Sequence, residues 1–107
     1  MNGVPELVIL RLLNAREMYG YELVQAIRLA TGNSISLGEG VVYPVLHGLE
    51  REGALKSRRR TINGRTRVYY TVTSGGTKRL ASLVQQWTRI ADAIGSLMKG
   101  PLNVPAI

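Results

Sequence analysis

Tyr43, His47 and Arg51 are the residues whose types and spacing point most clearly to chemistry, because steps of four place them on one face of a helix. All three side chains can donate hydrogen bonds. Directly after them the chain turns strongly basic: nine of its fourteen lysines and arginines lie between Arg51 and Arg79, where Glu52 is the only acid. A polar helix face beside concentrated positive charge predicts recognition of a polyanion, nucleic acid above all.

The sequence holds little material for catalysis. His47 is the only histidine and there are no cysteines, so disulfides and thiolate metal sites are excluded, and a histidine-based triad or metal site would depend on one residue. No phosphate-binding G-x-x-x-x-G-K-S/T loop occurs, and no pair of carboxylates lies in a polar, catalytic setting. We therefore expect a protein that is not an enzyme and that has no cofactor or metal.

Length and composition favour one small domain with at most one appended element. The chain has 107 residues, 45% of them hydrophobic, a net charge of +7 and a sequence pI of about 10.4. On charge alone, a basic protein without a polyanionic partner stays an open alternative, and an anionic membrane surface is a weaker one. The apolar run Leu7–Leu13 is interrupted by Arg11, so it is neither a signal peptide nor a membrane span of about 20 residues, and we expect a cytoplasmic protein.

The stretch Ser36–Leu55 predicts the helix that carries the polar face. Ser36 and Glu39 have the spacing of a capping box, and Gly53 is suited to end the helix. The core-facing positions, at steps of three and four, are Val42, Val45, Leu46 and Leu49. Pro44 leaves two alternatives open: it bends a helix that begins at Ser36, or it stands in the first turn of a helix that begins near Val42.

Two helices are predicted before this one. Pro5 suits a first turn, and the apolar run Leu7–Leu13 indicates a helix buried on most sides, with Asn14–Met18 as the loop after it. A second helix is expected over about Tyr19–Thr31. Its buried stripe would consist of Leu23, Ile27 and Ala30. Gly20, in its first turn, indicates either a close backbone approach or a tolerated glycine.

The most definite local signal is Asn63-Gly64, which stands between two β-prone runs and predicts a type I′ hairpin. With these two residues as the loop, Ile62 faces Arg65, and counting back fixes the other pairs. One face, expected to pack on the helices, holds Leu55, Ser57, Arg59, Val68, Tyr70 and Val72. The other is a basic stripe made of Lys56, Arg58, Arg60, Arg67, Tyr69 and Thr71. A bound phosphate would relieve the opposed charges of Arg60 and Arg67; the alternative is a solvated edge that deters aggregation.

A long helix is expected near the end of the chain, capped by Thr73 or Ser74 and reaching about Lys99. Its apolar residues recur every seven positions through three heptads, and they are Leu80, Leu83, Val84, Trp87, Ile90, Ala91, Ile94, Leu97 and Met98. A helix of about 25 residues would project well past a small core, which favours a dimerisation helix over one that packs on its own domain. Residues 100–107 indicate a frayed, flexible tail.

This order of elements is that of a mainly α winged helix-turn-helix with a small β-hairpin and a long C-terminal dimerisation helix. In these residues the chain resembles the PadR family of transcriptional regulators, in its shorter subtype with one C-terminal helix. The matching segments are Leu12-Leu13, Tyr19-Gly20-Tyr21-Glu22-Leu23, Val41-Val42-Tyr43-Pro44-Val45-Leu46, Leu49-Glu50-Arg51-Glu52-Gly53, Gly64-Arg65-Thr66-Arg67-Val68-Tyr69-Tyr70, Thr73-Ser74-Gly75-Gly76 and Trp87. The chain departs from the family at His47, where Arg is usual, and at Thr66-Arg67-Val68, where Pro-Arg-Lys is usual.

The resemblance implies a homodimeric repressor that binds a palindromic operator in double-stranded DNA. The residues expected to contact DNA are Ser36, Tyr43 and His47 in the third helix and Arg58, Arg60, Asn63, Gly64, Arg65 and Arg67 in the wing. It also implies release by a small aromatic or apolar ligand that stacks on Trp87; the alternative is that Trp87 is only a core residue of the seam. Residues 1–73 would bind DNA, 74–99 would form the dimer, and 100–107 would be the tail. The alternative is a winged-helix adaptor whose hairpin meets an acidic protein surface and reads no DNA.

Overall fold

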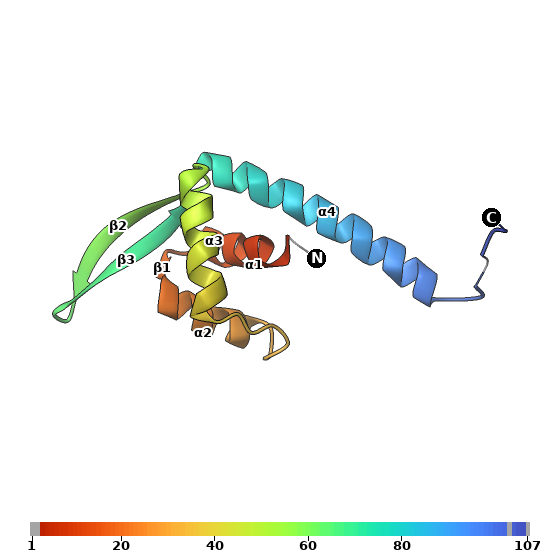
Figure 1. The fold of residues 1–107 in the computed structure, drawn as a ribbon, viewed down its shortest axis with the longest axis horizontal. Coiled ribbons are helices and arrows are strands. Elements are labelled where there is room, and N and C mark those ends of the chain that lie inside the picture. The colour runs from red at the N-terminus through yellow and green to blue at the C-terminus, as the bar shows by residue number, and fades with distance from the viewer. Residues whose placement is uncertain (1–2, 103, 107) are drawn as a thin grey trace.

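The computed structural model describes residues 3–102 and 104–106. In these residues, four helices and three strands follow one another: α1 (Val4–Ala15), β1 (Met18–Tyr19), α2 (Gly20–Ala30), α3 (Glu39–Arg51), β2 (Leu55–Ile62), β3 (Arg65–Val72) and α4 (Ser74–Met98). Helices α1, α2 and α3 lie together, the β2–β3 hairpin extends from one side, and α4 runs away on the other (Figure 1). The predicted fold class is confirmed. Of the predicted tail, Asn103 and Ile107 lie outside the described residues, and the rest forms no helix or strand.

The core lies where the first three helices meet the base of the hairpin. Its fully buried large side chains are Ile9, Leu10, Leu23, Ile27, Val42, Leu46 and Leu49. These residues recur at short helical steps, so each helix turns one apolar stripe inward. Leu55 and Tyr70 of the hairpin and Leu80 of α4 complete this core, while Val45 is half-buried at its edge.

The hairpin has the predicted register throughout, from Ile62 opposite Arg65 at the tip to Leu55 opposite Val72 at the base. Asn63 and Gly64 have φ angles of 53° and 76°, the positive values that a type I′ turn needs at both central positions. At its base the face that carries Leu55 packs on the helices, as expected, since Leu55 is 2% exposed, but Tyr69 on the predicted basic face is buried as well. The local turn chemistry thus decides which arginines share a face.

Helix α3 begins later than the capping box predicts. Gly38, not Ser36, is its N-cap, and no side chain caps the helix. The backbone N–H groups of Val41 and Val42 both donate to the Gly38 carbonyl at 3.0 Å. The extended residue Gly38 therefore takes the N-cap position that is predicted for Ser36. The observed start lies between the two predicted ones, and Pro44 stands in the helix interior.

The sequence does not predict strand β1. Met18 and Tyr19 pair antiparallel with β3, which makes β3 the central strand in the order β1-β3-β2. A strand of two residues has no periodicity to detect, and its partner lies far along the chain. Helix α2 consequently begins at Gly20, and its last residue, Ala30, is exposed and not on the buried stripe, because the final turn has passed the core.

Helix α4 is capped by Thr73, one of the two predicted residues, whose Oγ1 accepts a hydrogen bond from the backbone N–H of Gly76 at 3.1 Å. The helix reaches Met98, and the molecule measures 64 × 28 × 22 Å chiefly because α4 extends past the core (Figure 1). Among the described residues, no helix is long and apolar enough to cross a membrane.

Candidate nucleic-acid interface

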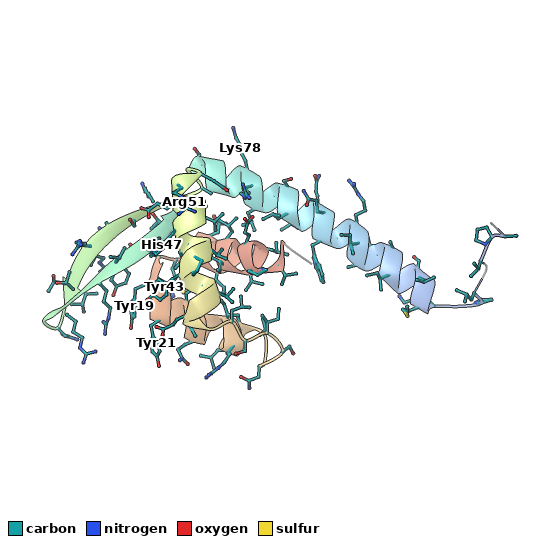
Figure 2. All side chains as sticks on the ribbon, viewed as in Figure 1. Tyr19, Tyr21, Tyr43, His47, Arg51 and Lys78 are labelled. Atoms are coloured by element: carbon teal, nitrogen blue, oxygen red, sulfur yellow. The ribbon has the colours of Figure 1, made fainter. Side chains whose placement is uncertain are left out.

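Helix α3 presents its polar stripe to solvent, as the spacing predicts. Tyr43 is half-buried, whereas His47 and Arg51 are exposed, and the three follow one another along α3 (Figure 2). The ring centroids of Tyr43 and His47 are 6.1 Å apart, so the two rings form one continuous ridge. A helix with hydrogen-bonding side chains along one exposed face has the size and chemistry to enter a DNA major groove.

A glycine of α2 allows Tyr43 to take this position. A Cβ atom on Gly20 would lie 2.3 Å from Cζ and 2.5 Å from the hydroxyl of Tyr43, so no other residue fits without moving the ring. Of the two interpretations of Gly20, the close approach is therefore right. The ring of Tyr43 rests on the first turn of α2, and this contact holds the two helices of the helix-turn-helix at a fixed separation.

The hairpin and α3 share a concave surface. The groove between them has a volume of about 470 Å³, and its lining residues are Tyr19, Gly20, Tyr21, Tyr43, His47, Arg67, Val68 and Tyr70. The guanidinium carbon of Arg67 lies 4.4 Å from the centroid of the Tyr19 ring, a cation–π contact that orients the arginine beside the groove. Three residues predicted to contact DNA, Tyr43, His47 and Arg67, are thus brought to one site.

Tyr70 lines this groove from the hairpin. Burial raises the pKa of Tyr70, and the neighbouring Glu50 carboxylate and Tyr43 add to that shift, so the phenol stays protonated. The hydroxyl of Ser57 donates to the Glu50 carboxylate, which joins β2 directly to α3. The base of the hairpin therefore holds a fixed position against the helix.

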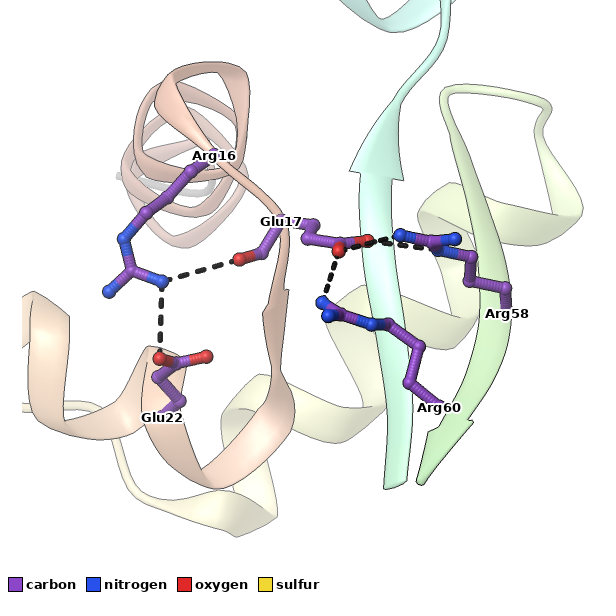
Figure 3. Close-up of polar contacts among 5 residues, drawn as sticks. All are labelled: Arg16, Glu17, Glu22, Arg58 and Arg60. Carbon is purple, nitrogen blue, oxygen red and sulfur yellow. Dashed lines mark hydrogen bonds and ion pairs between the residues drawn. The ribbon is translucent and has the colours of Figure 1, made fainter. Parts of the chain in front are cut away.

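Two arginines of the basic face, Arg58 and Arg60, are engaged within the protein. Arg58 donates to both carboxylate oxygens of Glu17, at 2.8 Å from Nη2 and 3.2 Å from Nε, and Arg60 donates to the same carboxylate (Figure 3). The hydrogen bond from Arg58, with the charges of both arginines, holds the pKa of Glu17 below its usual value, and Glu17 raises the pKa of Arg58. The sequence predicts DNA contacts for both arginines; in this structure both pair with one carboxylate just before β1, which offsets part of their charge.

The other predicted residues lie around this surface. Asn63, Gly64 and Arg65 form the exposed tip of the hairpin, and Ser36 is exposed in the loop before α3. Within residues 3–102 and 104–106, Arg65 and Arg67 form no ion pair. The tip therefore carries positive charge that no carboxylate of the described chain offsets.

Some residues of this surface are missing from the sequence prediction. Tyr19 and Tyr21 reach the groove because the short strand β1 leads directly into α2. Arg59 alternates onto the packing face, yet it is exposed, as is its partner Val68, because the hairpin has passed the helices at that point. The distance of Arg59 from Leu55, at the buried base of the hairpin, is the signal from which its exposure could have been predicted. Nothing local distinguishes Tyr19 or Tyr21.

The chemistry of this surface is binding. It combines tyrosine and histidine hydrogen-bonding groups, aromatic faces and arginines whose charge is not offset. In the part of the chain that the structure describes, no group of three or more His, Asp or Glu side chains is placed to hold a metal ion. Groups of these types are suited to bind phosphates and base edges without a covalent step.

Comparison with known proteins decides the class. The model of the PadR-like family of transcriptional regulators matches residues 9–82. The chain belongs to the PadR-like family. An uncharacterized protein from Lysinibacillus sphaericus is 33% identical over 101 residues, which make up 94% of this chain and 93% of that protein.

Solved structures extend the likeness of this PadR-like protein to nearly its whole length. A transcriptional regulator from Clostridium thermocellum superposes with a TM-score of 0.84 at 28% identity, over 92% of this chain and 93% of that one. A PadR family transcription regulator from Clostridium difficile gives a TM-score of 0.79 at 27% identity, over 91% and 100% of the two chains. The family match includes α3, the hairpin and the groove between them, and it makes this protein a DNA-binding regulator of transcription.

Proposed function

We propose that this PadR-like protein is a homodimeric repressor that binds a palindromic operator and that a small aromatic or apolar molecule releases it. The apolar surface that α4 leaves exposed carries the proposal. Its large apolar residues, each at least 38% exposed, are Val84, Trp87, Ile90, Ile94, Leu97 and Met98. Monomers rarely expose so long a stripe, and its heptad spacing fits a second α4. We therefore assign DNA binding to residues 1–73 and dimerisation to 74–99.

The surface that α4 offers to a partner is shorter than the predicted seam. Leu80 is 7% exposed and belongs to the core of its own chain. Leu83 is half-buried against that core, and Ala91 is half-buried farther along the helix. The proposed dimer contact therefore begins at Leu83 and Val84. Leu80 connects the seam to the winged helix.

On DNA, the proposed dimer places one α3 in each of two successive major grooves. Tyr43 and His47 face the base edges, and Ser36 lies beside them in the loop before the helix. The wing contacts, which supply affinity more than sequence readout, come from Asn63, Gly64, Arg65 and Arg67. Because a twofold axis relates the two copies of α3, the operator is a palindrome.

An effector has a suitable place between α1 and α4. A cavity of about 240 Å³ is lined by Gly3, Val4, Leu7, Leu83, Gln86, Trp87 and Ile90. Its walls are mostly apolar, and Trp87 is half-exposed, so the indole can stack on an aromatic ligand. Trp87 is the only tryptophan, so its fluorescence reports occupancy. A ligand that quenches this fluorescence and releases DNA supports the effector; one that quenches it while DNA stays bound contradicts this part of the proposal.

The test of the proposal is a titration of the purified protein against DNA from upstream of its own gene, at physiological salt and with a scrambled competitor. We expect specific protection of a palindrome, two chains for each duplex, and less transcript from that promoter in vitro. Binding that is salt-labile and independent of sequence contradicts the proposal and favours the alternative, a winged-helix adaptor that binds a protein partner. One chain on one half-site contradicts the dimer, and more transcript contradicts repression.

A further inference from the structure

Three elements meet at one side chain, Arg79, near the start of α4. Its guanidinium donates to both carboxylate oxygens of Glu6 on α1, at 2.8 Å and 3.1 Å from Nη2 and 3.1 Å from Nε. Its Nη1 lies 2.9 Å from Oε2 of Glu52, the residue that caps the C-terminus of α3. The hydrogen bonds to Glu6 raise the pKa of Arg79, with the charges of Glu6 and Glu52 adding to the shift. A planar guanidinium that binds two carboxylates at once fixes the directions of both.

The backbone closes the same junction. A Cβ atom on Gly76 would lie 2.1 Å from the carbonyl oxygen of Ala54, so the first turn of α4 lies directly against the chain that leaves α3. Thr73 Oγ1 donates to the carbonyl of Gly53 at 2.6 Å, and the backbone N–H of Thr73 donates to the carbonyl of Ala54 at 3.1 Å. Helix α4 therefore starts from a packed joint at the end of α3, and no flexible linker separates the two helices.

The length of α4 amplifies any change at this joint. The helix has 25 residues and so a length of about 37 Å. A tilt of about 5° at one end moves the other by about 3 Å, close to the 3.4 Å rise of one base-pair step. In a dimer joined through two such helices, the angle at each joint sets the distance between the two copies of α3.

We infer that Arg79 is a positioning residue that fixes the spacing of the two half-sites by locking α4 to α1 and to the end of α3. The inference rests on the homodimer proposed above. The side chains of Arg79 and Glu52 are 40% and 53% exposed, and exposed ion pairs contribute little to stability. Loss of the contact should therefore loosen an angle without unfolding the chain. Arg79 itself touches no base in this arrangement.

The test compares Arg79→Gln with the double variant Glu6→Gln/Glu52→Gln. The first lowers the net charge and the second raises it, so a purely electrostatic effect on DNA affinity would have opposite signs, whereas both remove the ion pairs of Arg79 at the joint. Arg89→Gln is the matched control, because Arg89 is exposed on the same helix and forms no ion pair within the described residues. Arg79→Lys keeps the positive charge but not the planar guanidinium, so its spacing preference should lie between those of wild type and Arg79→Gln. Thermal unfolding of every variant checks the fold.

The measurement uses a palindrome that the wild-type protein selects from random DNA, with one or two base pairs added or removed at its centre. We expect the wild-type protein and Arg89→Gln to prefer one spacing by at least about tenfold, a penalty of the size of one mismatched base pair. Arg79→Gln and the double variant should differ by less than about threefold between neighbouring spacings, with affinity for a single half-site within about twofold of wild type.

Two results would overturn the inference. Arg79→Gln could keep the wild-type spacing preference, or it could weaken binding to every spacing and to the single half-site equally, as a merely structural residue would. A failure of the dimer itself is distinguishable, because the wild-type protein would then select no palindrome and show no spacing preference.

Discussion

Two pairs of arginines on one hairpin have different surroundings. Arg58 and Arg60, on β2, both donate to the carboxylate of Glu17, and the guanidinium of Arg60 also lies 4.8 Å from the centroid of the Tyr69 ring. Arg65 and Arg67, on β3, have no ion pair within residues 3–102 and 104–106, although Arg67 lies directly opposite Arg60. All four residues have the same charge and lie on one short hairpin, so the sequence predicts the same role, contact with DNA, for each of them.

The difference shows that a basic segment is not a uniform binding surface. Glu17 is a single carboxylate, yet it offsets charge at two positions of β2 (Figure 3). It thereby gives the two arginines of β2 a supporting role and leaves the two arginines of β3 available for phosphates. We expect DNA binding to depend on the β3 pair, Arg65 and Arg67, much more than on the β2 pair, Arg58 and Arg60.

The largest effect is expected from reversing the charges of the β3 pair with Arg65→Glu/Arg67→Glu. Binding to specific and to non-specific DNA should weaken by about 100-fold. The negative slope of log affinity against log salt should become shallower by about 2, because two phosphate contacts are lost. The control, Arg28→Glu/Lys99→Glu, makes the same charge change at two exposed positions that do not line the groove. An unchanged salt slope would mean that the β3 pair is not part of the interface.

A smaller effect of opposite sign is expected from Glu17→Gln. Without the carboxylate, Arg58 and Arg60 become available to phosphates, so affinity at low salt should rise about fivefold and the salt slope should steepen by about 1. Glu22→Gln is the matched control, since Glu22 pairs with Arg16 and not with the hairpin (Figure 3). Equal gains in the two variants would mean that only net charge matters.

Removing the β2 pair of arginines should change DNA binding less than removing the β3 pair. For Arg58→Gln/Arg60→Gln we expect a loss of less than about threefold and a change in salt slope below about 1, since few phosphate contacts disappear. The melting temperature should fall slightly, because Glu17 keeps its charge and loses its partners. Losses as large as those of a matched Arg65→Gln/Arg67→Gln variant would erase the contrast.

The smallest effect concerns pH. Because its arginine partners lower the pKa of Glu17, the pair adds stability above the usual carboxyl pKa and loses it as pH falls through the lowered value. The melting temperature of wild type should exceed that of Glu17→Gln by about 2 °C at neutral pH, as for an exposed ion pair, and the gap should close below about pH 4. Calorimetry across this range measures the gap, and a gap that persists at low pH contradicts the ion-pair origin.

The hairpin was predictable because its information is local. Asn63-Gly64 specifies the turn, and the turn specifies every cross-strand pair, including Arg60 opposite Arg67. The heptads likewise indicate the length of α4, and the capping threonine marks its start. Where adjacent residues decide the geometry, sequence patterns were sufficient.

Contacts between distant segments were not predictable in the same way. Nothing near Glu17 indicates that its carboxylate will reach two arginines that lie 41 and 43 positions later in the chain. The same holds for strand β1 and for Gly20, where the sequence signals a close approach but not that its partner is Tyr43. The prediction of the start of α3 was wrong for a different reason: Ser36 has capping-box spacing, but the extended residue Gly38 is the N-cap.

Whether two copies of α3 read a palindrome is tested by the base preference of Tyr43→Phe/His47→Ala on the selected operator, measured at every position against wild type. If α3 reads bases in a symmetric dimer, preference should relax by about 1 to 3 kcal/mol at matching positions of both half-sites, with the salt slope unchanged. An unaltered base preference, or a change confined to one half-site, would contradict the claim that two copies of α3 read a palindrome.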